Sequence, residues 1–300
     1  MNGRITVFGG TGFIGRHLVS LLLRSGATVR VAARYPGRAA VATEPASEIV
    51  QADVLDDAAV SDAIAGADAV FNLVGILTET TRQTYRAVHV EGARRIALAA
   101  QRHVVMRVIH VSALGASPTS PAISDQTTAE GERAVLAAFP QATIVRPSLV
   151  YGEGDHFFSR FAAMSGSSPV LPLIGGGTTK FQPVFVGDLT AGLLELLNRS
   201  ETAGKIYEFG GPQVYSFKVL LELLLIALKR QRVMIPIPFA LAEMQAGFLE
   251  LLPNPPLTRD QVRLMKTDKV ASGMEPTLSD LGVQPRPLEG YLAAFGDKYD

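Results

Sequence analysis

Cysteine is absent from the 300-residue sequence, which excludes disulfides, a thiolate nucleophile and cysteine-bound metal. Excess charge of either sign is also absent, since 28 basic residues balance 28 acidic ones. Nothing therefore favours broad affinity for nucleic acid, and we expect no nucleic-acid partner. The longest apolar stretches, Val219–Leu228 and Phe239–Leu252, are shorter than the roughly 18 residues that a membrane-spanning helix needs.

Metal-ligand spacing is lacking as well, because the five histidines are scattered along the chain. We therefore predict no metal site. The first predicted strand begins by about residue 4, which leaves no room for a cleavable signal. We expect a cytoplasmic protein, with peripheral attachment to the inner face of a membrane as the alternative. The hydrophobic fraction of 47% predicts a substantial core.

The sequence does contain a glycine-rich turn near its N-terminus. The apolar run Ile5–Phe8 precedes the turn, a helical pattern follows it, and a second apolar run occupies Val29–Ala33. This is the layout of a dinucleotide-binding βαβ unit, in which glycines permit a tight turn, close approach to the diphosphate and close helix packing. The cofactor contacts predicted in this turn are Gly9, Thr11, Gly12, Phe13, Ile14 and Gly15.

Alternating strand and helix patterns continue to about residue 150 and predict an α/β fold with a Rossmann-type, doubly wound parallel sheet. Beyond Tyr151 glycines and prolines cluster, and a smaller C-terminal α/β lobe is expected. We assign residues 1–150 to the dinucleotide-binding domain and 151–300 to a smaller substrate or partner lobe. The segments near 181–188 and 205–210 are expected to return to the Rossmann core.

Two parts of the second half allow local predictions. The helix expected near Ala240–Leu252 is apolar on most faces, and we favour packing in the core of the lobe over a docking surface. The tail from Pro253 is proline-rich and is expected to be helix-poor until Leu288–Phe295.

Residues at the ends of the predicted strands indicate which dinucleotide is favoured. Arg34 ends the second strand, where an arginine can pair with a 2′-phosphate, so NADP(H) is favoured and NAD(H) is the alternative. A solvated loop charge is the other interpretation of Arg34. Asp53 ends the third strand and either accepts a hydrogen bond from the adenine amino group or caps the helix Asp56–Ala65. Gly75 lets the chain pass close to the cofactor, or is only a turn glycine. The other predicted cofactor contacts are Val54, Leu73, Val74, Ser112 and Pro147.

Taken together, these motifs resemble the extended or atypical branch of the short-chain dehydrogenase/reductase superfamily. The turn GGTGFIG (Gly9–Gly15), NLVG (Asn72–Gly75) and RPSLVYGEGD (Arg146–Asp155) are similar to landmarks of that branch. More narrowly, VSALGA (Val111–Ala116) and PPLTRDQV (Pro255–Val262) resemble the NAD(P)H-binding accessory subunits of respiratory complex I and their bacterial homologues. The resemblance implies a bound dinucleotide and a protein partner, or a peripheral membrane complex, contacted through the C-terminal lobe.

One departure from the superfamily bears on activity. The resemblance implies a tyrosine proton donor followed four residues later by a lysine that lowers the tyrosine pKa and holds the nicotinamide ribose. Counting back from Gly131 and Glu132 places Ser124 and Thr128 at those positions, near the start of a helix predicted over Thr127–Ala138. Neither residue can supply an acid or a fixed positive charge. Since no lysine occurs between residues 1 and 139, we expect no nearby substitute.

No residue is a firm catalytic prediction, and the candidates are Ser112, Tyr151 and His89. Ser112 corresponds to the superfamily's substrate-polarising serine, or else bonds to local backbone. Tyr151 lies in the loop after the sixth strand. His89 shares a helix face with Tyr85, and we favour a structural, hydrogen-bonded role for it.

The predicted function is that of a cofactor-holding accessory protein. Two alternatives remain open at this point: a reductase, epimerase or dehydratase with an unconventional proton donor, and a regulatory protein that senses the redox state of NADP(H).

Overall fold

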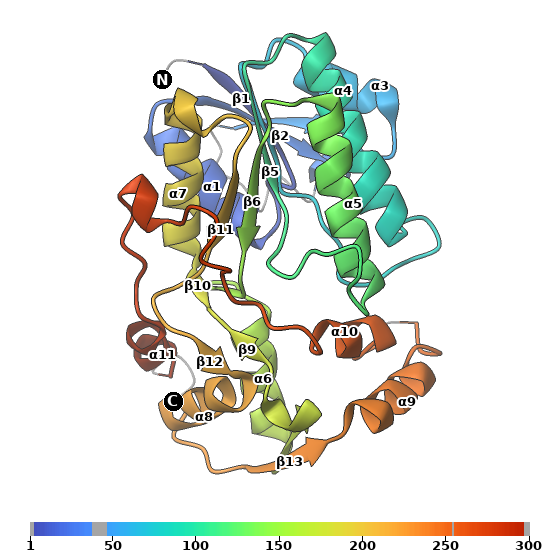
Figure 1. Ribbon diagram of the computed structural model, residues 1–300, viewed down its shortest axis with the longest axis vertical. Helices are drawn as coiled ribbons and strands as arrows, with labels where there is room; N and C mark the ends of the chain where they lie inside the picture. Colours follow the sequence, from blue (N-terminus) through green and yellow to red (C-terminus); the bar gives the residue numbers. More distant parts are fainter. Residues whose placement is uncertain (1–2, 38–46, 254, 297–300) are drawn as a thin grey trace.

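The computed structural model describes residues 3–37, 47–253 and 255–296. A seven-stranded sheet forms its centre, in the order β11-β6-β5-β4-β1-β2-β3 (Figure 1). Every neighbouring pair in this sheet is parallel, which confirms the predicted α/β class. The strands are β1 (Arg4–Phe8), β2 (Thr28–Ala33), β3 (Glu48–Gln51), β4 (Ala69–Asn72), β5 (Arg107–Val111), β6 (Thr143–Pro147) and β11 (Ile206–Phe209).

Helices cover both faces of this sheet, because its strands carry apolar side chains on both sides (Figure 1). One face packs against α1 (Phe13–Arg24) and α7 (Val186–Asn198). The other face packs against α3 (Asp57–Ile64), α4 (Ala93–Arg102) and α5 (Ile123–Ala138). A π-helical segment, η1 (Arg86–Gly92), leads directly into α4.

Strand order determines where a ligand can bind. β1 lies between β2 and β4 in the middle of the sheet. The chain therefore adds β2 and β3 on one side of β1, and then β4, β5 and β6 on the other side. In an open parallel sheet such a reversal leaves a crevice at the carboxyl ends of the strands. The glycine turn joins β1 to α1 at this crevice.

Two glycines of the turn are required by its geometry. Gly9 has a φ of +79°, and a Cβ there would lie 3.0 Å from the Leu73 carbonyl oxygen. A Cβ on Gly15 would collide with the Gly9 carbonyl oxygen and with Gly10 Cα, because α1 packs directly on the turn. The predicted tight turn and close helix packing are both confirmed here.

The second half of the chain divides between the sheet and a smaller lobe. β11 pairs with β6 and is therefore a strand of the central sheet, and α7 packs on α1 in the helical layer on one face of that sheet. The strand pairs outside the sheet are β7 (Val150–Tyr151) with β10 (Val184–Phe185), β9 (Lys180–Phe181) with β12 (Tyr215–Ser216), and β8 (Val170–Ile174) with β13 (Val233–Ile237). The boundary at residue 150 stays a prediction.

Five helices build the rest of this lobe, below the carboxyl ends of the sheet in Figure 1. They are α6 (Phe157–Ser167), α8 (Phe217–Ala227), α9 (Phe239–Leu249), α10 (Arg259–Leu264) and α11 (Leu288–Gly296). Single 3₁₀ turns lie at η2 (Gly175–Gly177), η3 (Ser200–Thr202) and η4 (Ser279–Leu281).

The predicted start of one helix was wrong, because a contact between distant segments decides where that helix begins. α5 begins at Ile123 rather than near Thr127, since the Asp260 carboxylate accepts hydrogen bonds from the N–H groups of Ile123 and Ser124. The described part of the tail before α11 has little helix, as expected: it contains the six-residue α10, which a capping box between Thr258 and Gln261 starts, and the 3₁₀ turn η4.

The packing expected for α9 was also wrong. Only Ala242 and Ala246 of this helix are buried, whereas Met244 and Phe248 are 57% and 69% exposed. Small residues form the buried stripe of α9, so Leu241, Met244 and Phe248 face outward, whereas Phe239 packs against the cluster around Ala242 and Ala246.

Gly15→Ala tests the close approach of α1 to the turn. We expect the free energy of unfolding to fall by about 1–3 kcal/mol, because the added methyl group overpacks a backbone contact. Urea denaturation gives this value. Gly247→Ala in α9 is the matched control, since its Cβ would meet only Arg259 at an ordinary 3.6 Å. Equal stability of the Gly15→Ala variant and the wild type would contradict this account.

Candidate functional site

Two adjoining cavities open at the carboxyl ends of β1, β4 and β5. The small cavity has a volume of about 200 Å³ and lies between β1, β2 and the β4 loop. The large cavity has a volume of about 530 Å³ and reaches the start of α5 and the C-terminal lobe. The cavities form one continuous cleft, because both are lined by Gly9, Gly12, Leu73, Val74, Gly75 and Ile76.

The predicted cofactor residues converge on this cleft, with one exception. Those that line the small cavity are Gly9, Thr11, Gly12, Arg34, Val54, Leu73, Val74 and Gly75. The large cavity adds Phe13, Ile14, Gly15, Ser112 and Pro147. Residues from six segments of the sequence therefore surround a single elongated space.

Asp53 is the exception, since it lines neither cavity. Its Oδ1 accepts a hydrogen bond from the N–H of Leu55, at 3.1 Å. The alternative prediction, that Asp53 caps the following helix, is wrong, whereas the predicted contact with the adenine amino group stays a prediction. Asp56 caps α3 instead, by accepting hydrogen bonds from Ala58 and Ala59 at 2.9 and 3.1 Å.

The start of α1 is suited to a diphosphate. No side chain caps α1 after Gly12, and no acidic residue occupies its first turn. The N–H groups there and the positive end of the helix dipole favour an anion. Arg34 lies at the far side of the small cavity, exposed, with its guanidinium over the Tyr35 ring at 5.8 Å from the centroid. A dinucleotide fits this set of residues.

A buried pair fixes the wall formed by the β4 loop. Asn72 accepts a hydrogen bond from the N–H of Val74 at 3.1 Å and donates one to Nδ1 of His110 at 3.0 Å. The His110 ring is therefore an acceptor at Nδ1, which requires the neutral form. Burial lowers the pKa of His110 from its ordinary value of 6.5 to about 4.

His89 has the structural role that the sequence favours. Its Nε2 accepts a hydrogen bond from the N–H of Ile76 at 3.1 Å, and its Nδ1 lies 3.1 Å from the Thr127 hydroxyl. That hydroxyl donates to backbone carbonyls of α5, so His89 Nδ1 is the donor of the pair. Burial lowers the pKa of His89. Both ring nitrogens are engaged, and the ring holds η1, α5 and the β4 loop together.

Ser112 lines the large cavity, but its hydroxyl is already used. Ser112 Oγ donates to the buried carboxylate of Glu132. Arg146 binds the same carboxylate through two hydrogen bonds, of 2.8 and 2.6 Å. The alternative that Ser112 bonds only local backbone is wrong, because its partner is a carboxylate on α5. Its proton is directed at Glu132 and not at a ligand carbonyl.

Tyr151 is not part of the cleft. Its side chain is fully buried, packs against the rings of Phe158 and Tyr291, and donates a hydrogen bond to the Arg286 carbonyl at 3.0 Å. Burial also raises the pKa of its hydroxyl. The candidacy of Tyr151 as a cleft acid is therefore wrong, and this tyrosine serves the core of the C-terminal lobe.

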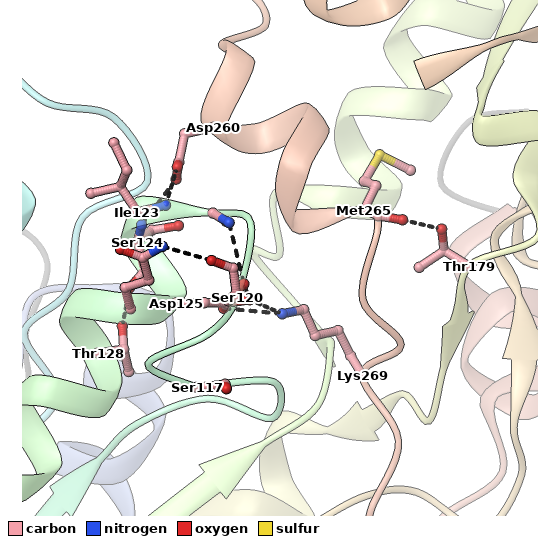
Figure 2. A network of polar contacts seen from close by, with 12 residues as sticks. Ser117, Ser120, Ile123, Ser124, Asp125, Thr128, Thr179, Asp260, Met265 and Lys269 are labelled. Atoms are coloured by element: carbon pink, nitrogen blue, oxygen red, sulfur yellow. Dashed lines mark hydrogen bonds and ion pairs between the residues drawn. The ribbon is translucent and has the colours of Figure 1, made fainter. Parts of the chain in front are cut away.

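The residues at the expected tyrosine and lysine positions do line the large cavity. Thr128 donates its hydroxyl to the Ser124 carbonyl at 2.8 Å. Ser124 Oγ is buried and has no hydrogen-bond partner among the residues that the structure describes. Figure 2 shows both on the first turns of α5.

The expectation that no lysine lies nearby was wrong. Lys269, which follows α10, lines the large cavity and binds both carboxylate oxygens of Asp125 at 2.8 and 3.0 Å (Figure 2). No local pattern marks Lys269, since 144 residues separate it from Asp125. Only the packing of the C-terminal segment across the cleft brings the two together.

Within the described ranges, no cluster of three or more histidine or acidic residues is placed to hold a metal ion. None of the described helices is both long and apolar enough to cross a membrane.

Sheet order, glycine turn and cleft together define a dinucleotide-binding protein of the doubly wound α/β class. Comparison with known proteins agrees: the chain belongs to the NAD dependent epimerase/dehydratase family, whose model matches residues 5–210. This confirms the resemblance to the extended short-chain dehydrogenase/reductases.

Curated relatives are more specific than the family. The mitochondrial NADH dehydrogenase [ubiquinone] 1 alpha subcomplex subunit 9 of Arabidopsis thaliana is 34% identical over 310 residues, covering 98% of this chain and 77% of that protein. Its counterpart in Mus musculus is 33% identical over 291 residues, covering 95% and 77%.

Solved structures share the fold. An NADPH-dependent quinone oxidoreductase from Escherichia coli, complexed with NADPH, matches with a TM-score of 0.75 at 19% identity, covering 97% of this chain and 99% of that one.

The neutral His110 predicts a pH dependence of stability. Its pKa is lowered in the folded chain, so the unfolded chain binds more protons between pH 6.5 and about 4. The free energy of unfolding should fall as the pH falls through this window, by an amount on the order of 3 kcal/mol. Denaturant titrations at several pH values measure it. His110→Gln should have a shallower slope, and identical slopes would contradict the assignment.

Proposed function

We propose that this protein holds a nicotinamide dinucleotide as a tightly bound cofactor and serves as an accessory subunit of respiratory complex I. The observation that carries the proposal is the state of Ser112. A cleft with a diphosphate-binding turn is present, yet the one hydroxyl at the end of β5 is committed to the Glu132–Arg146 pair.

Two other potential proton donors in the cleft are also engaged within the protein, which supports this proposal. His89 uses both ring nitrogens within the protein, and Thr128 donates its hydroxyl to backbone. Ser124 is a poor acid in the place where active superfamily members carry a tyrosine. The cleft walls therefore favour holding a ligand in place over relaying a proton.

The proposed cofactor would be held by named groups of this chain. The N–H groups after Gly12 would bind the diphosphate, and Gly9 and Gly75 would let backbone approach it. When bound, a nicotinamide supplies hydride chemistry. A ligand that binds only the folded chain also raises stability, by about 2.7 kcal/mol at a hundredfold excess over its Kd.

We favour NADP(H) over NAD(H) on account of Arg34. Among the described residues that line the small cavity, Arg34 is the charged one, and no carboxylate faces it there. A guanidinium can pair with a 2′-phosphate through two hydrogen bonds, whereas a ribose 2′-hydroxyl favours a carboxylate acceptor.

The proposed partner surface lies on α9 and the residues after it, in the C-terminal lobe. Its exposed apolar side chains are Leu241, Met244, Phe248, Leu251 and Leu252. A contiguous apolar surface of this kind favours a protein or membrane contact. The relatives are named as mitochondrial subunits of NADH dehydrogenase, so we propose complex I as the partner and a peripheral position at a membrane as the location.

Purified protein should bind NADPH. Arg34→Ala should weaken the binding of NADPH by about tenfold or more and have little effect on the binding of NADH. The reason is loss of a charge-assisted contact to the 2′-phosphate. Titration of the reduced nicotinamide fluorescence gives both affinities.

The same samples test for turnover. Bound NADPH should not be oxidised when carbonyl compounds are added. Oxidation at enzyme rates, about 1 s⁻¹ or faster, would overturn the accessory role and favour a reductase.

In native membranes the protein should migrate with complex I. Phe248→Glu should reduce this comigration strongly, because a charge on the proposed surface opposes an apolar contact. Native gels with immunodetection measure it. Met106→Glu is the control, since Met106 is equally exposed, at 69%, but precedes β5 at the amino end of the sheet. Equal comigration of both variants and the wild type would reject this surface.

A further inference from the structure

Lys269 is held in place by backbone contacts before its side chain reaches the cleft. Its N–H donates to the Lys180 carbonyl at 2.8 Å, and its carbonyl accepts hydrogen bonds from Gln182 at 3.1 Å and Ser148 at 2.6 Å. The side chain is 13% exposed. A lysine anchored in this way has few alternative positions for its ammonium group.

The C-terminal segment that carries Lys269 is fastened at both ends of its path over α5. Asp260 on α10 binds the first N–H groups of α5, and the Met265 carbonyl accepts a hydrogen bond from Thr179 (Figure 2). Lys269 follows and binds Asp125 in the first turn of α5. The segment thus contributes Leu264 and Lys269 to the lining of the large cavity.

The Lys269–Asp125 pair is close to neutral as a unit. Asp125 has a side chain only 4% exposed and takes two of the three N–H donors of the ammonium group, which leaves one for a ligand. Because the carboxylate offsets the positive charge, this part of the cavity does not favour an anion. It favours neutral oxygen atoms that can both accept and donate hydrogen bonds.

Ser124 adds a second polar group to the same cavity. Ser124 is a lining residue of the large cavity, and its hydroxyl is buried and has no partner among the described residues. An unsatisfied buried hydroxyl costs about 1–3 kcal/mol, which a ligand oxygen would recover. A donor from Lys269 together with the Ser124 hydroxyl matches two neighbouring hydroxyl groups, as on a sugar ring.

We propose that Lys269 and Ser124 bind the hydroxyl groups of the ribose next to the nicotinamide, so that the C-terminal segment contributes directly to dinucleotide binding. The proposal rests on the proposed function. A diphosphate at the start of α1 leaves the second ribose to extend along the large cavity, whose walls include Gly12, Ser124 and Lys269. Lys269 is a binding residue in this account and transfers no proton.

Lys269→Met tests the proposal with two probes. The affinity for NADPH should fall about tenfold or more, because a hydrogen bond from a charged group is lost. The affinity for adenosine 2′,5′-bisphosphate, which lacks the second ribose, should not change. Nicotinamide fluorescence and calorimetry measure the two. Lys266→Met is the matched control, since Lys266 lies three residues earlier and binds Glu243.

Lys269→Met leaves the buried carboxylate of Asp125 without its ion-pair partner, which destabilises the fold. A double variant separates this effect from the loss of binding. Asp125→Asn with Lys269→Met removes both charges and should show the same selective loss of NADPH. If the single variant does not fold, the double variant decides. Equal affinity of variant and wild type for NADPH, or equal weakening of both probes, overturns the proposal. If the wild type binds neither probe, the proposed function itself fails.

Discussion

The direct packing of α1 on the glycine turn is the constraint on which the rest of the structure depends. Gly15 leaves no space for a side chain against the Gly9 carbonyl, and this contact aims the first turn of α1 into the crevice beside β1. Strand order then places β4 and β5 along the same crevice. Each group that lines the cleft is positioned relative to this one backbone contact.

Buried polar groups in the cleft are used mainly to fix its walls. His110 and Asn72 hold the β4 loop, His89 joins that loop to α5, and Glu132 joins α5 to β5 and β6. Such satisfied networks make a binding surface rigid, because breaking any one contact leaves a buried polar group unpaired. The same contacts occupy the hydroxyl of Ser112 and both ring nitrogens of His89, which supports the accessory role that we propose.

The sequence-based predictions succeeded where a motif is local. The turn from Gly9 to Gly15 and the strand ends at Arg34 and Gly75 lie in the cleft as expected, since each is fixed by its neighbours along the chain. Predictions failed where packing between distant segments decides. Tyr151 follows β6 closely enough to suggest the cleft, yet its ring belongs to the aromatic core of the lobe. Asp53 is a local exception: its carboxylate accepts a hydrogen bond from the N–H of Leu55 and does not cap α3, which Asp56 does.

By itself the sequence determined the α/β class and the dinucleotide turn, because these follow from residue types at short spacing. The assignment of Ser124 and Thr128 to the tyrosine and lysine positions rests on the resemblance to the family and stays a prediction. Only the tertiary structure decided which polar groups remain for a ligand. It paired Ser112 with Glu132, buried Tyr151 in the lobe and brought Lys269 across the cleft to Asp125. The physical reason is that hydrogen bonding and burial depend on neighbours in space, and the neighbours of these residues are far away along the chain.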